Sequence, residues 1–345
     1  MPSEFLLSTE SRQRLHALLE NALGETGALG ATLALMVDGE PMVRVGLGAL
    51  AAQPDATFYA YSVTKTVLAT LALQLSEAGR LELDSPIRTW LPDLPFRTPM
   101  TLRQVLNHTS GLPDYGGMPS YRQAVQSTPE TAWEPSRFME LISDATLLFA
   151  PGQGWSYSNL GYMLISRIIE AVSGLSPDEN LASGIAAPLG LTETRFVSSR
   201  AEARDLTPGF EGGPDRANII SRYDPGWVAH GVVRSTALEL ARFMDGVATG
   251  RLLGEFWQGQ MLSAVPVPGE FAPGRDPAYG LGLMVETMSS GRPFGHNGEG
   301  PGYSVASWSL TAAGHRIAGA CMVNQSIPNA AQTILFKAFD AILKA

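Results

Sequence analysis

The 345-residue sequence contains a single cysteine, Cys321, so no disulfide can form within the chain. It also lacks any apolar run of the roughly 18 residues that a membrane-spanning helix needs. Basic side chains are outnumbered by acidic ones, 24 against 33, which gives a net charge of −9. Nucleic acid and anionic membranes would meet no complementary charge on such a protein, and we expect neither as a partner.

Residues 1–21 lack the basic stretch followed by an apolar stretch that is typical of a secretory signal. A lone cysteine is also compatible with a reducing compartment. Together these two features favour a cytoplasmic location. Nothing in the sequence indicates the oligomeric state.

Lysine is scarce, because Lys65, Lys337 and Lys344 are the only lysines among the 24 basic residues. An arginine keeps its proton in a protein, whereas a lysine can lose it when its surroundings lower its pKa. Lys65 is therefore a candidate for a position where a neutral amine is required.

Apolar patterns predict strands near both ends of the chain and mostly helices between them. Asp38 and Gly39 separate two apolar runs and predict a hairpin, because both residue types tolerate the positive φ of a tight turn. Further strands are expected at 279–285, 303–310 and 316–323, and helices at 8–24, 63–78, 160–172, 235–247 and 330–343. The predicted fold class is α+β, an antiparallel sheet flanked by helices. The sheet domain would comprise residues 1–80 and 226–345, with a mainly helical lobe inserted at 81–225.

Ser62 and Lys65 lie three residues apart at the predicted start of a helix, where such a spacing places two side chains on one face. A serine hydroxyl is a weak nucleophile and needs a base within about 3 Å, and a lysine serves when its pKa is depressed. The amide of Ser62 at the helix start would also be available to an oxyanion. The pair is a candidate nucleophile and base, although Ser-x-x-Lys alone also occurs by chance.

Two further motifs bear on whether Ser62 and Lys65 belong to an active site. Tyr157-Ser-Asn159 precedes a predicted helix, where it is either part of a site or a helix cap with a packing tyrosine. Gly295-His-Asn-Gly298 is either part of a site or a glycine-rich turn between strands. Each motif is ambiguous alone, so their joint occurrence in one chain carries the argument.

The motifs Ser-Val-Thr-Lys (62–65), Tyr-Ser-Asn (157–159) and His-Asn-Gly (296–298), in this order, resemble those of the beta-lactamase-like serine hydrolases. That family includes class C beta-lactamases, DD-peptidases, D-aminopeptidases and the family VIII carboxylesterases. Similar stretches occur at 102–112, 188–194 and 231–236. The resemblance covers most of the chain and implies an active site in the cleft between sheet and helical lobe, with no cofactor and no metal.

The resemblance also implies a role for each residue of the three motifs. Ser62 would attack a carbonyl carbon, and Lys65 and Tyr157 would pass its proton to the leaving group. Asn159 would hydrogen-bond the substrate or Lys65.

The third motif would border the bound acyl group through His296 and Gly298. The amide of Glu299 would then complete an oxyanion hole with the amide of Ser62. His296 stands where beta-lactamases have a lysine, so the fixed charge that would meet an anionic substrate is missing or depends on pH. The side chain of Glu299 would disfavour anions further if it faced the cleft.

We therefore expect a small-molecule ester or amide as the substrate. A carboxylesterase acting on small or medium uncharged esters is favoured over a D-amino-acid peptidase or amidase and over a weak beta-lactamase. A catalytically inactive penicillin-recognising or scaffold protein would keep the fold, but such proteins usually lose the nucleophile or the base.

Two other enzyme classes are less consistent with the sequence. A Ser-His-Asp hydrolase would need Gly-x-Ser-x-Gly, and the stretch at 302–306 lacks the final glycine. The five histidines show no metal-binding spacing. Whether His230 faces the cleft is left open by the sequence.

Overall fold

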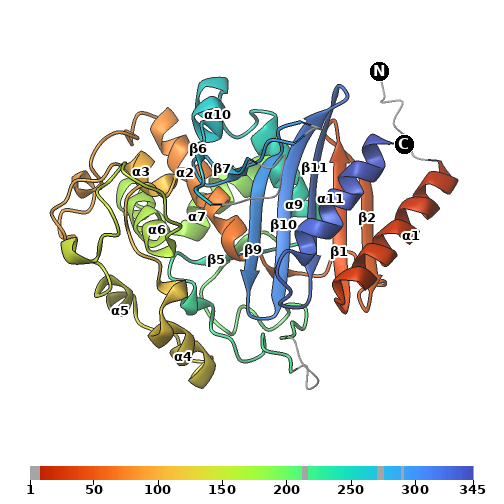
Figure 1. Ribbon diagram of the computed structural model, residues 1–345, viewed down its shortest axis with the longest axis horizontal. Coiled ribbons are helices and arrows are strands. Elements are labelled where there is room, and N and C mark those ends of the chain that lie inside the picture. The colour runs from red at the N-terminus through yellow and green to blue at the C-terminus, as the bar shows by residue number, and fades with distance from the viewer. Residues whose placement is uncertain (1–7, 212–216, 270–275, 289–290, 345) are drawn as a thin grey trace.

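The computed structural model describes residues 8–211, 217–269, 276–288 and 291–344 (Figure 1). Residues 1–7, which form part of the segment examined for a signal, lie outside this range. The helices are α1 (Thr9–Thr26), α2 (Thr64–Glu77), α3 (Leu102–Leu106), α4 (Pro119–Ser127), α5 (Pro135–Met139), α6 (Asn159–Ser173), α7 (Pro177–Leu181), α8 (Ala187–Leu189), α9 (Ala237–Ala248), α10 (Glu255–Leu262) and α11 (Ala330–Leu343). The strands are β1 (Gly30–Val37), β2 (Glu40–Gly48), β3 (Phe58–Tyr59), β4 (Arg195–Val197), β5 (Val232–Ser235), β6 (Val265–Pro266), β7 (Ala278–Tyr279), β8 (Met284–Val285), β9 (Phe294–Gly300), β10 (Tyr303–Ala312) and β11 (His315–Val323).

The main sheet is antiparallel, with the strand order β2-β1-β11-β10-β9-β8-β7-β6. It is built from both ends of the chain, because β1 pairs with β2 on one side and with β11 on the other. Asp38 and Gly39, between β1 and β2, have φ angles of 50° and 90°, as a hairpin of this type requires. The predicted α+β fold and the predicted hairpin are confirmed.

Helices cover both faces of this sheet. α1 and α11 pack on one face through apolar side chains such as Leu19, Ile334 and Phe339, which share a core with Leu33 of β1. α2 and α9 lie in a second core, which includes Met36 of β1 and extends into α6. Figure 1 shows α3 to α6 on the side of the molecule away from α1 and α11. The exact division into residues 1–80 with 226–345 and 81–225 stays a prediction.

Some element predictions were wrong. The apolar run at 279–285 is not one strand but two short ones, β7 and β8, separated by Gly282 with φ +81°. The helix expected from residue 235 begins at Ala237, because Ser235 still belongs to β5. The sequence also gave no sign of the small sheet β3-β5-β4.

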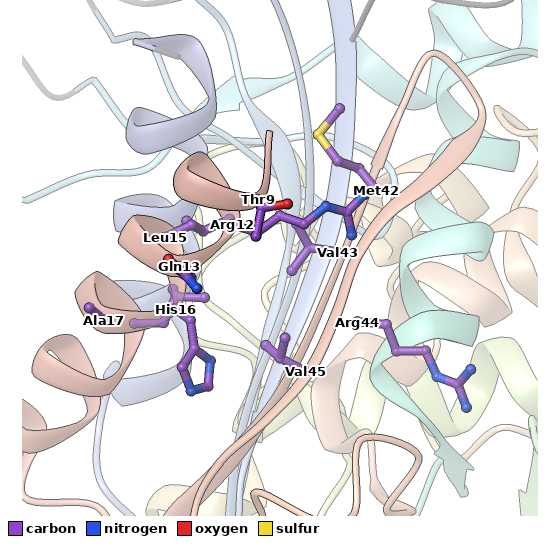
Figure 2. Close-up of a pocket in the computed structure, with 11 residues that line it drawn as sticks. Thr9, Arg12, Gln13, Leu15, His16, Ala17, Met42, Val43, Arg44 and Val45 are labelled. Atoms are coloured by element: carbon purple, nitrogen blue, oxygen red, sulfur yellow. The ribbon is translucent and has the colours of Figure 1, made fainter. Parts of the chain in front are cut away.

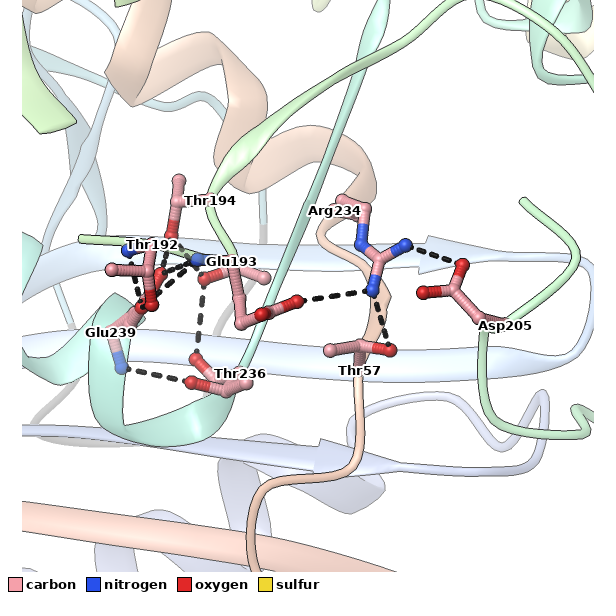
Figure 3. A network of polar contacts seen from close by, with 9 residues as sticks. Thr57, Thr192, Glu193, Thr194, Asp205, Arg234, Thr236 and Glu239 are labelled. Carbon is pink, nitrogen blue, oxygen red and sulfur yellow. Dashed lines mark hydrogen bonds and ion pairs between the residues drawn. The ribbon is translucent and has the colours of Figure 1, made fainter. Parts of the chain in front are cut away.

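This small sheet is tied to its surroundings by a polar network around Arg234 of β5 (Figure 3). The Arg234 guanidinium is 1% exposed and donates to Asp205 at 2.6 Å, Thr57 at 3.1 Å and Glu193 at 3.3 Å. Glu239 in the first turn of α9 accepts hydrogen bonds from the segment preceding β4, including the amide of Glu193. The network therefore fixes β5 and the start of α9 relative to the segments on either side.

A mainly apolar cavity of about 430 Å³ lies between α1 and β2, where Leu15, Leu19, Val43 and Val45 are among the lining residues (Figure 2). β2 forms one edge of the sheet, four strand positions from β9 and thus about 19 Å away along the sheet.

Among the described residues, no helix combines the length and apolar character needed to cross a membrane.

Candidate active site

Ser62 lies in a short 3₁₀ turn, η1 (Tyr61–Val63), that leads directly into α2. The residue before it, Tyr61, has a φ of 44°, which is an unfavourable conformation for a bulky aromatic residue. Tyr61 is held there by burial and by a hydrogen bond of 2.5 Å from its hydroxyl to the carbonyl of Pro301. The strained turn leaves Ser62 partly exposed above a buried helix.

Lys65 lies one helical turn after Ser62 and is completely buried. Its Nζ is 3.3 Å from Ser62 Oγ, 2.6 Å from Asn159 Oδ1 and 3.3 Å from His230 Nε2. Burial lowers the pKa of Lys65 from 10.5 to about 7, and the negative charge of Asp114 opposes this shift. The amine can therefore lose its proton near neutral pH, which is the property that a base for Ser62 requires.

Tyr157 borders the same amine from the segment before α6. Lys65 Nζ lies 4.9 Å from the centroid of the Tyr157 ring. Burial raises the pKa of Tyr157, although its contact with the Ser62 side chain acts in the opposite direction. The phenol therefore keeps its proton at neutral pH. Ser158 is the N-cap of α6, so the motif is both a helix cap and part of the cluster.

Asn159 is oriented by Asp114, a residue that the sequence analysis did not select. The Asp114 carboxylate accepts from the backbone amide of Asn159 at 3.0 Å and from its side-chain Nδ2 at 2.8 Å. Since Nδ2 is occupied in this way, Oδ1 of Asn159 points to Lys65 Nζ. Asp114 thus sets the orientation of the amide that contacts Lys65.

The third motif lies within strand β9 and not in a turn. An added Cβ on Gly298 would lie 2.2 Å from the carbonyl oxygen of Ala60 and 3.2 Å from the amide nitrogen of Ser62. The strand backbone therefore passes directly beside the turn that carries Ser62. β9 pairs with β8 only at Phe294 and Gly295, so in the described chain its remaining edge faces this turn.

His296 is 1% exposed, and both of its ring nitrogens contact protein atoms. Nδ1 lies 2.5 Å from the carbonyl oxygen of Asn297 and must carry the proton, so Nε2 accepts the hydrogen bond of 2.9 Å from the Tyr279 hydroxyl. Burial and the nearby charge of Lys65 lower the pKa of His296 to about 3. The ring is neutral and supplies no charge to the cleft.

The side chain of Glu299 points away from Ser62, because successive side chains of a strand lie on opposite faces. Its carboxylate accepts a hydrogen bond of 2.7 Å from the amide of Asn329, at the start of α11. The neighbouring odd-numbered residue, Asn297, likewise bonds Gln332 of α11. The carboxylate of Glu299 therefore does not add negative charge beside Ser62, whereas its backbone amide remains the predicted oxyanion donor.

The structure thus brings together Ser62, Lys65, Tyr157 and Asn159, with Gly298 against the Ser62 turn and His296 buried nearby. His230 joins them although the sequence left its position open. Its only signal was a histidine directly before a glycine, which is too common to identify a site. Among the residues that the structure describes, no group of three or more His, Cys, Asp or Glu side chains is arranged to hold a metal ion.

With this geometry in hand, comparison with known proteins identifies the family. Residues 15–340 match the family described as Beta-lactamase, and the chain belongs to that family. It is similar to penicillin-binding protein 4* of Bacillus subtilis, with 27% identity covering 87% of this chain and 69% of the relative. It is 30% identical to esterase EstB of Burkholderia gladioli over 62% of this chain and 59% of the esterase.

Among solved structures, a D-stereospecific amidohydrolase from Streptomyces sp. is similar with a TM-score of 0.80 and 27% identity. The similarity covers 94% of this chain and 98% of the amidohydrolase. These relatives support a serine hydrolase of the beta-lactamase family and differ among themselves in substrate.

Proposed function

We propose that the protein is a carboxylesterase that cleaves small or medium uncharged esters through an acyl-enzyme at Ser62. Lys65 takes the proton of Ser62 as Oγ bonds to the carbonyl carbon. Tyr157 protonates the departing alkoxide as the ester C–O bond breaks, and the Lys65 ammonium returns a proton to Tyr157, so both groups regain their starting forms. Water then cleaves the acyl-enzyme by the reverse proton path. The amides of Ser62 and Glu299 stabilise the oxyanion, and one such donor is typically worth about 10² to 10³ in rate.

The observation that carries the proposal is the buried amine of Lys65, which lies 3.3 Å from Ser62 Oγ and has a pKa of about 7. A lysine that only stabilised the fold would not need to face a partly exposed serine at hydrogen-bonding distance. An inactive binding protein would likewise have no need of a base that deprotonates at neutral pH.

The preference for uncharged substrates rests on the third motif. The neutral ring of His296 offers no cation to a substrate carboxylate, and both of its nitrogens are engaged by protein atoms. Penicillins and the ends of peptide substrates carry a carboxylate, so they lack this partner here. Similarity to the esterase EstB supports the same choice.

The test is turnover of p-nitrophenyl butyrate by the wild type and by Ser62→Ala. The wild type should hydrolyse the ester and Ser62→Ala should lose at least about 10³ of kcat/KM, because the nucleophile is gone. Tyr157→Phe is the companion variant, with an expected loss of about 10² to 10⁴ from the missing proton transfer. Ester hydrolysis that survives in Ser62→Ala would refute the assignment of the nucleophile.

A second candidate function is hydrolysis of D-amino-acid amides, favoured by the nearly complete structural overlap with the Streptomyces amidohydrolase. D-alanine p-nitroanilide and a chromogenic cephalosporin, assayed beside the ester, separate the alternatives. A kcat/KM for the anilide above that for the ester, lost in Ser62→Ala, would keep the mechanism and replace the substrate class. Turnover dominated by the cephalosporin would contradict the argument from His296.

A further inference from the structure

His230 makes a contact with Lys65 that the proposed proton transfers do not use. Its Nε2 lies 3.3 Å from Lys65 Nζ, and the residue is 2% exposed. The ring of Tyr162 packs against it, with the two ring centroids 6.3 Å apart. A histidine so placed can act on Lys65 directly.

The backbone that carries His230 is bonded to the turn that carries Ser62. β5 begins two residues after His230, and the carbonyl of Val233 accepts a hydrogen bond of 2.7 Å from the amide of Ala60. The amide of Val233 donates in turn to Thr64 Oγ1 at 3.1 Å. These bonds lie on either side of Ser62, so His230 and the nucleophile are held in one rigid unit.

The ammonium form of Lys65 has three N–H groups, and the structure offers three acceptors for them. Ser62 Oγ, Asn159 Oδ1 and His230 Nε2 each lie within 3.3 Å of Nζ. A buried ammonium with a missing acceptor would be strongly destabilised, because burial has already removed its water. His230 therefore completes the set that a protonated Lys65 requires.

His230 can act as an acceptor only while its ring is neutral. Among the described residues, titratable groups that contact or act on the ring or Lys65 are Lys65 of α2, His108, Asp114, Tyr157, Tyr162 of α6 and His296 of β9. Burial is the main cause that holds the pKa of His230 well below its usual value, and the positive charge of Lys65 acts in the same direction. With Nε2 accepting from Lys65, the proton of the ring is on Nδ1, which has no partner among the described residues. Nδ1 of His230 is thus unpaired in the described part of the chain, while Nε2 accepts a hydrogen bond from Lys65.

We propose that His230 is a positioning residue for the reaction at Ser62. As a neutral acceptor it directs Nζ of Lys65 between Ser62 and Asn159, and it stabilises the ammonium that forms when Lys65 takes the proton of Ser62. This inference rests on the proposed function, because it assigns His230 a role in the same proton transfer.

The first test compares His230→Leu with His230→Gln, since the side-chain amide of glutamine can place an acceptor near the position of Nε2. In His230→Leu the Lys65 ammonium loses an acceptor, so the pKa of Lys65 should fall. The acid limb of the pH profile, where kcat/KM for p-nitrophenyl butyrate rises with pH, should therefore move to lower pH by at least half a unit. Its kcat on the plateau should fall about tenfold or more, with KM little changed. His230→Gln should keep the acid limb within about 0.3 pH unit of the wild type.

Two results would overturn the inference. An acid limb at the wild-type pH in folded His230→Leu would show that the residue only fills space. A limb that moved to higher pH would show that His230 is a cation that repels Lys65, because removing a positive neighbour raises the pKa of an amine.

A chemical rescue covers the case in which His230→Leu fails to fold. His230 also lines a cavity of about 740 Å³, whose walls include Trp133, Phe138, Phe196 and Val228. This cavity gives a small ring a place beside the truncated side chain of His230→Ala. Imidazole should restore its activity at least fivefold, whereas pyrrole, which has the same shape but no acceptor nitrogen, should not. Equal rescue by both rings, or by neither, would contradict an acceptor role.

Labelling of Ser62 by a fluorophosphonate distinguishes failure of this inference from failure of the proposed function. Absence of label at Ser62 in the wild type would remove the proposed nucleophile and with it the basis for both. Normal labelling and ester turnover in the wild type, with an unshifted acid limb in His230→Leu, would refute the role of His230 alone.

Discussion

At the scale of single residues, the proposed chemistry depends on how readily Lys65 gains and loses its proton. Lys65 is buried, so its charged form is disfavoured, yet Ser62, Asn159 and His230 still provide acceptors for that form. Desolvation and hydrogen bonding therefore act in opposite directions. Burial lowers the pKa of Lys65 to about 7 against the opposing charge of Asp114, so the same amine can accept a proton and release it during one turnover.

This balance predicts the pH dependence of ester hydrolysis. Below about pH 7 Lys65 is protonated and cannot accept the proton of Ser62, so kcat/KM should rise tenfold per pH unit and level off above about pH 7. Since burial raises the pKa of Tyr157, this residue should cause no decline up to about pH 10. A profile measured from pH 5 to pH 10 checks both the rise below about pH 7 and the absence of a decline up to about pH 10.

Lys65→Arg is the control for this profile. Its guanidinium keeps a positive charge but cannot act as a base, so activity should be lost at every pH. If Lys65→Arg kept more than a tenth of the wild-type activity, Lys65 would not be the base.

At the scale of elements, the site depends on the close approach of β9 to the turn before α2. Gly298→Ala would add a Cβ 2.2 Å from the carbonyl oxygen of Ala60, and the strand would have to move away from Ser62. We expect kcat/KM to fall about 10² because the oxyanion donors separate, and the free energy of unfolding to fall by about 1–3 kcal/mol. Kinetics and urea unfolding of the same variant measure the two effects.

Gly259→Ala in α10 is the matched control for that substitution. A Cβ at Gly259 would meet nothing within 4 Å, so activity should stay at the wild-type level. The free energy of unfolding should rise slightly, since alanine is favoured over glycine within a helix by about 1 kcal/mol. Equal losses of activity in both alanine variants would contradict the specific role of Gly298.

Local signals were sufficient for those elements whose sequence pattern and packing agree. The positive-φ pair Asp38 and Gly39 and the spacing of Ser62 and Lys65 needed no knowledge of the rest of the chain. The break between β7 and β8 could not be predicted, because Gly282 is fixed by its approach to α2, where an added Cβ would lie 2.2 Å from Ala69. Asp114 was missed and the position of His230 was left open for a similar reason, since only the folded chain brings them to Asn159 and Lys65.

At the scale of the whole molecule, the network around Arg234 joins segments that are distant in sequence. Thr57 precedes β3, Glu193 precedes β4, and Asp205 lies between β4 and β5. The guanidinium is buried, whereas the side chains of Asp205 and Glu193 are 65% and 45% exposed. Removing the two carboxylates therefore leaves a buried charge, while removing the arginine leaves carboxylates that water can solvate.

This asymmetry predicts that Asp205→Asn with Glu193→Gln destabilises the fold more than Arg234→Met does. We expect a loss of about 2 kcal/mol in the double variant, below the 3–5 kcal/mol typical of a fully buried pair because solvent screens the exposed carboxylates. Arg234 also holds the pKa of Asp205 below its usual value, so this contribution is present at neutral pH and is lost as the pH falls through that lowered pKa. Urea unfolding at pH 7 compares the variants, and a larger loss in Arg234→Met would contradict the argument.

The pairing of β1 with β11 has a consequence for how the protein is made. Residues 31–37 are synthesised long before their partners at 317–323, which lie far along the chain. Before β11 is synthesised, β1 can pair with β2 in the hairpin, but the edge of β1 that later pairs with β11 has no partner strand. Since contacts so far apart in sequence slow folding, the nascent chain must keep this edge from pairing with other chains while the rest is translated.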